Sequence, residues 1–481
     1  MAEATGQMAQ ATGQVADATG QVQTPVEPVD RAVDGSKCPF AHVSTLEDVS
    51  RLLRSKTAVT HSPDLFASRA SDEVNGEINV REFLAASMMY TEGDSHRLRR
   101  KLLNPLVRAD ALQGIREDVV LPEADRLMAL WLTEPDADGV YRLDLIEFLE
   151  RIFIHFTARL IGLTDMDADE RLALMRSFAG PLAAGTSSGF LADRDTVNKR
   201  ALAAKKRYVE EFFTPSLRWH REMRARIDAG EIADEEVPPS LLKLVAAGAA
   251  PEWADEENAV VESTLLFAAS VGTSTQSIVH TIDFLQTWFA EHPEDLGQRG
   301  DPAFLLHCLQ ETIRLRAPFS PYTTRLSLER NKLADGTTIY PGQELHLEWV
   351  KANRDAVVFG PDAVGFNPNR ATPADGTPRY GLGFGLGVHQ CYGLRVVVGN
   401  DGSGGAHVML LKKLMDAGVR PDPDNPPVGL EKDMDKFDVE DIPRYIKYPA
   451  IFSDPAIFSD PAIFSDTAIF DDTAISDGGA A

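Results

Sequence analysis

Residues 383–393 read Gly-Phe-Gly-Leu-Gly-Val-His-Gln-Cys-Tyr-Gly, with four glycines around a single cysteine. Glycines this dense let a backbone pass close to something flat or bulky. A phosphate cradle is one interpretation, but no Lys-Ser or Lys-Thr pair follows. A nucleophilic cysteine with His389 as its base is another, although residues two apart on a tight loop rarely bring their side chains together. The third is a metal-bound thiolate at Cys391, with Gly387 and Gly393 clearing space and backbone N–H groups donating to the sulfur.

Outward from this loop, the middle of the chain is mostly helical. Apolar residues at three- and four-residue spacing predict helices over 143–163, 196–213 and 255–289. The last of these is long enough to cross a whole domain. Alternation of apolar and polar residues predicts strands mainly at 323–328 and 337–347. We therefore expect a mainly α fold with a small β region before its C-terminal third.

Both ends of the chain are repetitive. Ala-Thr-Gly-Gln recurs from Ala4, and Pro-Ala-Ile-Phe-Ser-Asp recurs from Pro449. The first repeat is too poor in large apolar groups to bury a core. We expect residues 1–42 to be a disordered leader, 43–448 to form one large domain, and 449–481 to be a flexible acidic tail.

Composition excludes several classes of function. The 481 residues include 48 Lys and Arg against 73 Asp and Glu, a net charge of −25 that would repel nucleic acid and anionic lipid. No apolar run reaches the roughly 18 residues that span a bilayer, and the first residues lack a signal-peptide pattern. Three cysteines without a Cys-x-x-Cys pair argue against a disulfide scaffold or a structural zinc site, and predict a cytoplasmic protein.

The cysteine loop resembles a known signature. Its pattern Phe384-x-x-Gly387-x-His389-x-Cys391-x-Gly393 is similar to the haem-binding motif of the cytochrome P450 family. Companion motifs of that family occur in the right order: His96-x-x-x-Arg100, Glu311-x-x-Arg314, Ala352-Asn353-Arg354-Asp355 and Phe366-x-Pro368-x-Arg370. The resemblance covers residues 43–448 and implies a P450-like fold with a long central helix over the haem.

The resemblance implies a role for each matching residue. Cys391 would bind the iron of haem b as a thiolate, with Phe384 packed beside it as an apolar cover. Further cofactor contacts would come from Gly385, Gly387, Gly393 and the propionate-binding residues His96, Arg100, Arg325 and His389. Glu311, Arg314 and Arg370 would form a buried network that braces the cysteine loop, although the spacing of the first two is also typical of a weak surface pair.

In the family, the long helix bends beside the iron at a motif that ends in an acid and a threonine. The matching stretch runs from Ala269 to Thr275, and the resemblance makes Thr273 the alcohol that hydrogen-bonds dioxygen, between Gly272 and Ser274. Gly272 stands where the acid usually precedes the threonine. Protons would then come through ordered water, Ser270, Ser274 or the substrate, or the enzyme would start from a peroxide. Hydroxyl residues in a helix also commonly bond the carbonyl four residues earlier.

A second departure from the family follows the cysteine. Residues 399–405 read Gly-Asn-Asp-Gly-Ser-Gly-Gly and interrupt the expected helix, which we expect to restart near Ala406. Basic residues that we expect to gather on this proximal face, where an acidic ferredoxin would dock, are Arg99, Arg395, Lys412 and Lys413.

These observations predict a haem-thiolate monooxygenase that inserts one oxygen atom from O2 into a lipophilic organic substrate by hydroxylation or epoxidation. We expect a monomer whose electrons come from NAD(P)H through a separate ferredoxin-like donor and its reductase. The pocket would be lined by the segment before His96, residues 179–213, the middle of the long helix and residues 318–323. A peroxygenase or hydroperoxide-rearranging enzyme is the alternative that Gly272 favours. A non-enzymatic haem sensor, with Cys38-Pro39-Phe40-x-His42 as a regulatory contact, is the third.

Overall fold

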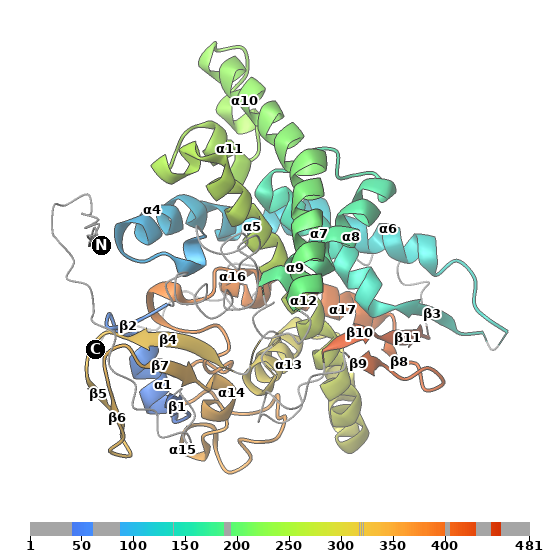
Figure 1. Ribbon diagram of the computed structural model, residues 1–481. Coiled ribbons are helices and arrows are strands. Elements are labelled where there is room, and N and C mark those ends of the chain that lie inside the picture. Colours follow the sequence, from blue (N-terminus) through green and yellow to red (C-terminus); the bar gives the residue numbers. More distant parts are fainter. Residues whose placement is uncertain are drawn as a thin grey trace, which may run out of the picture.

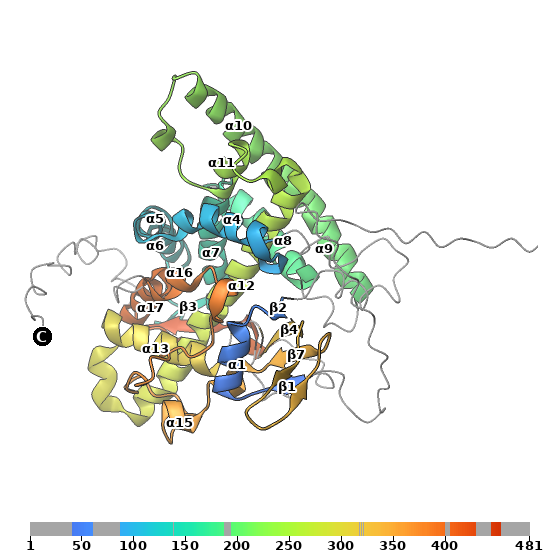
Figure 2. The same ribbon diagram turned by 90° about the vertical axis from the view of Figure 1, so that its left-hand side faces the viewer.

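The computed structural model describes residues 41–60, 87–137, 139–186, 194–316, 318, 320, 322–399, 405–429 and 444–453. Helices make up most of this part of the chain, and a small β region lies to one side with α1 (Leu46–Leu53) against it (Figures 1 and 2). The predicted fold class, mainly α with a small β region, is confirmed. The leader through residue 40 lies outside the described residues, and so does the sensor contact expected at Cys38.

The long central helix is α12 (Glu256–Glu291), with 36 residues. It begins where the Asp255 carboxylate accepts a hydrogen bond from the Glu257 N–H, which satisfies one free donor of the first turn. It packs against α7 (Leu145–Ile161), α8 (Asp169–Thr186) and α13 (Pro302–Leu315), and most of its side chains are therefore buried. The predictions of helices at 143–163 and 255–289 are confirmed by α7 and α12.

The remaining helices agree with the expected pattern. The helix predicted at 196–213 corresponds to α9 (Arg194–Tyr208) and the π-helical turn η5 (Val209–Phe213). The other helices are α4 (Gly93–Leu103), α5 (Ala109–Ile115), α6 (Leu121–Trp131), α10 (Thr214–Asp228), α11 (Leu241–Ala246), α14 (Trp349–Ala352), α15 (Ala356–Phe359), α16 (Leu394–Val398) and α17 (Ala406–Asp416). Short helical turns are η1 (Met88–Tyr90), η2 (Asn104–Val107), η3 (Arg116–Val120), η6 (Asp234–Glu236), η7 (Pro251–Ala254), η8 (Pro293–Gln298) and η9 (Gly387–His389).

The expected restart of the helix after the cysteine is confirmed. Helix α16 ends at Val398, and α17 begins at Ala406. Gly405 is needed at this junction, because a Cβ on it would collide with the carbonyl oxygens of Val396 and Val397. Gly405 therefore lets the start of α17 approach the end of α16 closely.

The main sheet has the strand order β1-β7-β4-β2. Its strands are β1 (Ala41–Val43), β2 (Ala58–Val59), β4 (Thr323–Ser327) and β7 (Glu344–Leu347), of which only β1 and β7 pair in parallel. Strands β5 (Asn331–Lys332) and β6 (Thr338–Ile339) form a separate hairpin, and β9 (Val428–Gly429) pairs with β10 (Tyr445–Lys447). The strands expected at 323–328 and 337–347 are confirmed by β4, β6 and β7.

The predicted start of the C-terminal tail is wrong by one repeat. Residues Pro449–Phe452 form β11, the middle strand of a sheet with β3 (Tyr141–Asp144) and β8 (Arg420–Pro421). Ala450, Ile451 and Phe452 are buried. Because the first Ile-Phe pair of the hexapeptide repeat lies beside β3, it joins the core although its sequence is the same as that of the next copies. The predicted start of the domain is similarly two residues late, since β1 begins at Ala41.

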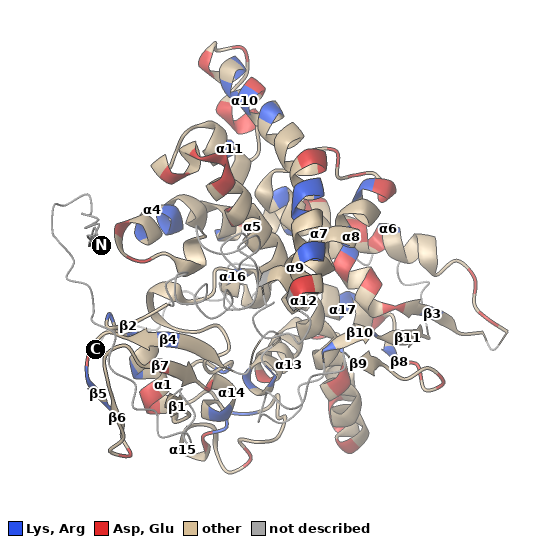
Figure 3. Ribbon diagram, viewed as in Figure 1, with Lys and Arg blue, Asp and Glu red and all other residues tan. Residues whose placement is uncertain are grey.

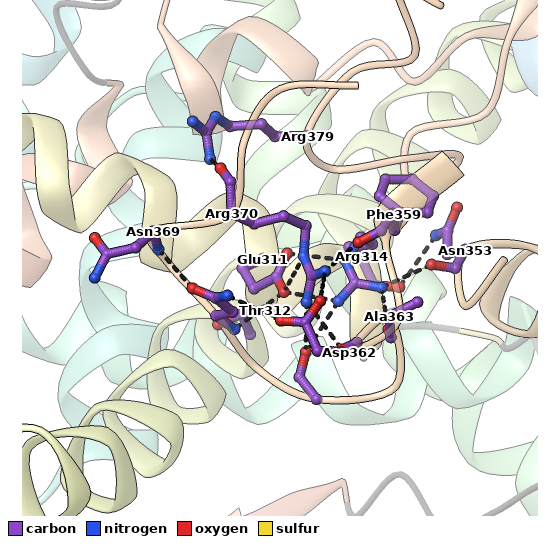
Figure 4. A network of polar contacts seen from close by, with 12 residues as sticks. Glu311, Thr312, Arg314, Asn353, Phe359, Asp362, Ala363, Asn369, Arg370 and Arg379 are labelled. Atoms are coloured by element: carbon purple, nitrogen blue, oxygen red, sulfur yellow. Dashed lines mark hydrogen bonds and ion pairs between the residues drawn. The ribbon is translucent and has the colours of Figure 1, made fainter. Parts of the chain in front are cut away.

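A buried network of charged side chains joins α13 to the loop before the cysteine (Figure 4). Arg314 donates two hydrogen bonds to Glu311, at 2.7 and 2.8 Å, and Arg370 donates to the same carboxylate at 3.0 Å. The remaining donors of Arg314 reach the carbonyl oxygens of Asn353, Ala363 and Gly365 at 2.5–3.1 Å. A guanidinium with all its donors occupied and its charge paired is satisfied inside a protein.

Asn353 carries this network to the cysteine loop. Its Nδ2 donates to the Arg314 carbonyl at 3.1 Å, and its Oδ1 accepts from the Leu382 N–H at 2.7 Å. Gly383 then passes so close to Ile313 on α13 that a Cβ there would lie 2.5 Å from the Ile313 Cγ2 atom. Helix α13 therefore sets the position at which the cysteine loop starts.

A second buried ion pair connects α4 to α12. Arg99 Nη1 lies 3.0 Å from Glu262 Oε2, and both side chains are almost completely buried. Glu262 also accepts two hydrogen bonds from the Met88 N–H, so it ties the segment before α4 to the central helix. Burial raises the pKa of Glu262 to about 7, while Arg99 and the Met88 N–H act in the opposite direction.

The expected basic proximal face is therefore only partly correct. Helix α4 carries a run of basic residues (Figure 3), but Arg99 points into the core toward Glu262. Lys413 is also buried and pairs with Asp125. Arg395 is exposed and Lys412 is half-buried, so these two remain on the surface. Sequence position alone does not tell which face of a short helix turns inward.

We expect Arg314→Lys to lower the free energy of unfolding by about 3 kcal/mol, because an ammonium cannot replace a guanidinium that binds five acceptors on four residues. Urea unfolding would measure the change. The matched control is Arg299→Lys, an exposed residue at which the same substitution should change the free energy by less than about 0.5 kcal/mol. Equal effects at both positions would contradict the role of the network.

We expect Glu262→Gln to cost about 3–5 kcal/mol, because it leaves the Arg99 guanidinium buried without a counter-charge. The double variant Arg99→Leu with Glu262→Leu should be more stable than Glu262→Gln, since it removes both charges. Asp110→Asn, which breaks the exposed Arg108–Asp110 pair, is the control and should leave stability unchanged. Thermal and urea unfolding of the variants would show the order.

Candidate functional site

The cysteine loop is closed by its own backbone. The Cys391 N–H donates to the Phe384 carbonyl at 2.8 Å, so the chain from Phe384 to Cys391 forms a compact bend. Gly385 and Gly387 lie in the left-handed region, with φ of +64° and +75°, which explains why glycine is required at both positions. A Cβ on Gly387 would lie 2.7 Å from the Leu53 carbonyl oxygen, so this glycine makes room for the end of α1.

The thiol of Cys391 is accessible although it lies deep in the protein. Its side chain is exposed, yet desolvation raises its pKa. The neighbouring N–H groups of Gly393 and Leu394 and the nearby charge of Arg100 lower that pKa again and so favour the thiolate. An accessible sulfur with neighbouring amide N–H groups and a nearby cation is suited to binding a metal as a thiolate.

His389 does not contact Cys391. Within the described part of the chain, its ring lies 4.4 Å from the ring of His96, and its Nε2 is 3.0 Å from Glu92 Oε2. This Nε2–carboxylate contact has an ion-pair distance but is too bent to be a good hydrogen bond. The geometry therefore disfavours the interpretation of Cys391 as a nucleophile with His389 as its base.

Three of the four residues expected to bind propionates gather around one acid. Glu92 contacts His389 directly, and its charge acts on both His96 and Arg325. Desolvation would raise the pKa of Glu92, but the close contact with His389 and the hydrogen bonds from Thr60 bring it down to about 2. Desolvation and the charge of His389 lower the pKa of His96 to about 4, so this ring is neutral at neutral pH.

Arg100, the fourth of these residues, lies elsewhere in the site. Its guanidinium is 5.4 Å from the centre of the Tyr392 ring, and it acts on the Cys391 charge. Arg325 is buried and donates to Thr323 Oγ1 and the Thr324 carbonyl, at 3.2 and 2.8 Å. Glu92 was missed by the sequence analysis, although it stands only four residues before His96.

The middle of α12 has an accessible strip between two buried stretches. Ala269 is exposed and Thr273 is half-buried. The Thr273 hydroxyl donates to the Ala269 carbonyl at 2.5 Å, which is the local bond to the carbonyl four residues earlier. The Ser270 hydroxyl lies 2.8 Å from the Thr157 hydroxyl on α7, so it faces away from the strip, and Ser274 is buried.

Gly272 lies beside this strip and next to a cation that the sequence analysis missed. A Cβ on Gly272 would lie 3.2 Å from Arg444 Nη2. Arg444 is distant in sequence and belongs to no motif, so no local signal pointed to it. Much of the remaining pocket wall expected from the sequence lies outside the described residues, which leave out 61–86, 187–193, 317, 319 and 321.

The residues of this site fit a haem. The accessible thiol of Cys391 can serve as an axial ligand. The exposed Ala269 offers a surface without a large side chain opposite a flat group, and His96, Arg325 and His389 offer donors for anionic substituents. Both ribbon views place α16, which follows the cysteine, beside α12 (Figures 1 and 2). In the described residues, no helix has the length and apolar composition of a membrane span.

Comparison with known proteins agrees with this geometry. The family model described as Cytochrome P450 matches residues 298–396, which contain Glu311, Arg314, Arg370 and Cys391. No curated protein matches the sequence. Among solved structures, ligand-free cytochrome P450 TbtJ1 is 21% identical with a TM-score of 0.59, and 86% of this chain aligns with 91% of that chain.

Two further structures show the same fold. P450BioI, solved in complex with an acyl carrier protein ligated by hexadec-9Z-enoic acid, is 14% identical with a TM-score of 0.61, over 86% of this chain and 92% of that chain. Cytochrome P450 EryK from S. erythraea is 20% identical with a TM-score of 0.57, over 86% and 90% of the two chains. The chain therefore has the fold of the cytochrome P450 structures, and residues 298–396, which include the cysteine loop, match the Cytochrome P450 family model.

Proposed function

We propose that a domain from Ala41 to Phe452 binds haem b through Cys391 and oxidises a lipophilic organic substrate with O2. The observation that carries the proposal is the accessible Cys391 thiol in its closed glycine-rich bend, where nearby N–H groups and the charge of Arg100 favour the thiolate. Haem, when bound, supplies the iron chemistry that activates dioxygen and transfers one oxygen atom. The protein then has to hold the thiolate, orient the cofactor, deliver protons and exclude water.

In this proposal the cysteine loop holds the sulfur at a defined position. Glycines 385, 387 and 393 allow its bend, and Phe384 packs edge-on against Tyr380, at 5.0 Å between ring centres, as an apolar cover. Glu311, Arg314 and Arg370 brace the loop through Asn353. Such support keeps the nearby N–H groups in place around the sulfur, which limits its basicity and helps set the redox potential.

The propionates are proposed to bind at His96, Arg100, Arg325 and His389. The support is that three of these residues already surround an anion, the Glu92 carboxylate. Arg100, between Tyr392 and the thiol, is placed to balance the charge of the thiolate. Glu92 would share the donors of this cluster, and so it is a further residue that sets how tightly the propionates are held.

Oxygen activation is proposed to involve Thr273, with Gly272 and Ser274 beside it. The accessible strip of α12 exposes Ala269 next to the Thr273 hydroxyl. The Thr273 hydroxyl donates its proton to the Ala269 carbonyl oxygen, so its own oxygen is left to accept a further hydrogen bond. Ser270 is a poor proton route because it faces Thr157 on α7.

Electrons are proposed to come from NAD(P)H through a ferredoxin-like donor and its reductase. The exposed Arg395, four residues after Cys391, offers positive charge near the proximal face, whereas the half-buried Lys412 is paired with Asp416. The rest of the chain is strongly acidic, with a net charge of −25. A small basic area on an acidic protein steers an acidic partner mainly by raising the association rate.

Cys391→Ala should abolish the red-shifted Soret band of the reduced, carbon monoxide-bound protein, because that band requires thiolate ligation. The matched control is Cys308→Ala, since Cys308 is fully buried on α13 with a pKa raised by burial and should not be a ligand. Loss of the band in both variants, or its retention in Cys391→Ala, would contradict the proposal. Absorption spectra of dithionite-reduced samples are sufficient.

A peroxide-using enzyme is the second candidate, favoured by Gly272 and by the local bond of Thr273. In the proposed monooxygenase, Thr273→Val should lower product formed per NAD(P)H consumed by about 10-fold or more, because proton delivery is impaired. Thr273→Ser restores the hydroxyl and is the control. With peroxide as the oxidant, the Thr273→Val variant should keep the turnover of the wild type. If the wild-type protein is active only with peroxide, the result favours the second candidate.

A further inference from the structure

Arg444 lies at the wall of the proposed oxygen-activation site. It immediately precedes β10, and its Nη2 is 3.2 Å from the position that a Cβ on Gly272 would occupy. On α12, Gly272 stands three residues after the exposed Ala269 and one before Thr273. The guanidinium of Arg444 is therefore beside the accessible strip of α12.

The backbone next to Arg444 is held in place by α12 itself. Gln276, one turn after Gly272, donates from Nε2 to the Tyr445 carbonyl and accepts from the Tyr445 N–H, both at 2.9 Å. The Tyr445 hydroxyl is anchored on Asp283 at 2.5 Å. These bonds fix the start of β10, so the contact between Arg444 and Gly272 follows from the packing of β10 on α12.

Among the residues that the structure describes, no acid is in contact with the Arg444 guanidinium. Within the described residues it makes no ion pair or hydrogen bond, and its nearest acid by electrostatic effect, Glu150, is already bound to Arg176 at 2.9 Å. Its side chain is exposed, yet desolvation lowers its pKa. Because the guanidinium is accessible, an anion that binds it gains a charge-assisted hydrogen bond.

Gly272 leaves room for that anion. A side chain at this position would start 3.2 Å from Arg444 Nη2, so a carboxylate attached there would lie against the guanidinium. With glycine in its place, no side chain from this position covers the guanidinium, so another carboxylate can reach it. A guanidinium fits a carboxylate with two parallel hydrogen bonds, which makes the contact selective for an acid over an amide.

We propose that the substrate of this enzyme is a lipophilic carboxylic acid whose carboxylate binds Arg444 beside Gly272. This inference rests on the proposed function, because it assigns the substrate class of the same site. The apolar part of the molecule would lie along the exposed Ala269 surface of α12. The carboxylate of the substrate would also supply the negative charge that the described residues do not place next to the Arg444 guanidinium.

The test uses the haem-loaded protein and calorimetric titration with matched pairs of ligands. The probes are butanoic, hexanoic, decanoic and phenylpropanoic acids, each compared with its own primary amide. We expect at least one acid to bind the wild type about 10-fold or more tightly than its amide. Arg444→Gln should remove that preference, and Arg444→Lys should keep part of it.

Two further variants make the test specific. Gly272→Asp should also remove the preference, because its carboxylate occupies Arg444. Lys447→Gln changes an exposed cation on the same strand and should leave the preference intact. The proposal is overturned if no acid binds the wild type more tightly than its amide, or if Arg444→Gln keeps the preference. The Soret band of the reduced, carbon monoxide-bound protein, recorded for each variant, tells this failure from a failure of the proposed function.

Discussion

The guanidinium of Arg314 connects segments that no helix or strand joins. It binds Glu311 on its own helix and carbonyl oxygens from three positions between residues 353 and 365. These carbonyl oxygens belong to irregular segments of the backbone. Burying them without hydrogen-bond donors would cost free energy. The Asn353 side chain then hydrogen-bonds both the Arg314 carbonyl and the Leu382 N–H, and so connects this network to the start of the cysteine loop. The position of the Cys391 sulfur thus depends on a polar interaction made well away from it.

Buried charges recur around the site, and they differ in how they are balanced. The Arg99–Glu262 pair is closed, with each partner bonded to the other and to its surroundings. The Glu92 cluster has one acid that contacts His389 and acts on the buried Arg325. Among the described residues, Arg444 has no acid in contact with it.

Much of the fold could be predicted because its signals are local. The apolar spacing of 255–289 matches α12 to within two residues, and the glycine-rich break after the cysteine ends where α17 begins at Ala406. The motif around Cys391 predicted a sulfur with N–H donors, and the N–H groups of Gly393 and Leu394 lie near it. Arg99 and Lys413 were misplaced on the surface because their partners, Glu262 and Asp125, are far away in the sequence. The first copy of the C-terminal repeat was misplaced for the same reason.

The sequence by itself therefore determined the resemblance to the cytochrome P450 family, the candidate ligand and the order of the helices, since each depends on residues within a few positions of one another. Only the tertiary structure decided which charges meet. It placed Glu92 against His389, and it placed Arg444 against Gly272, where the sequence had shown only a missing acid. Such contacts depend on how α4, α12 and β10 pack, and packing brings together residues whose separation along the chain carries no pattern.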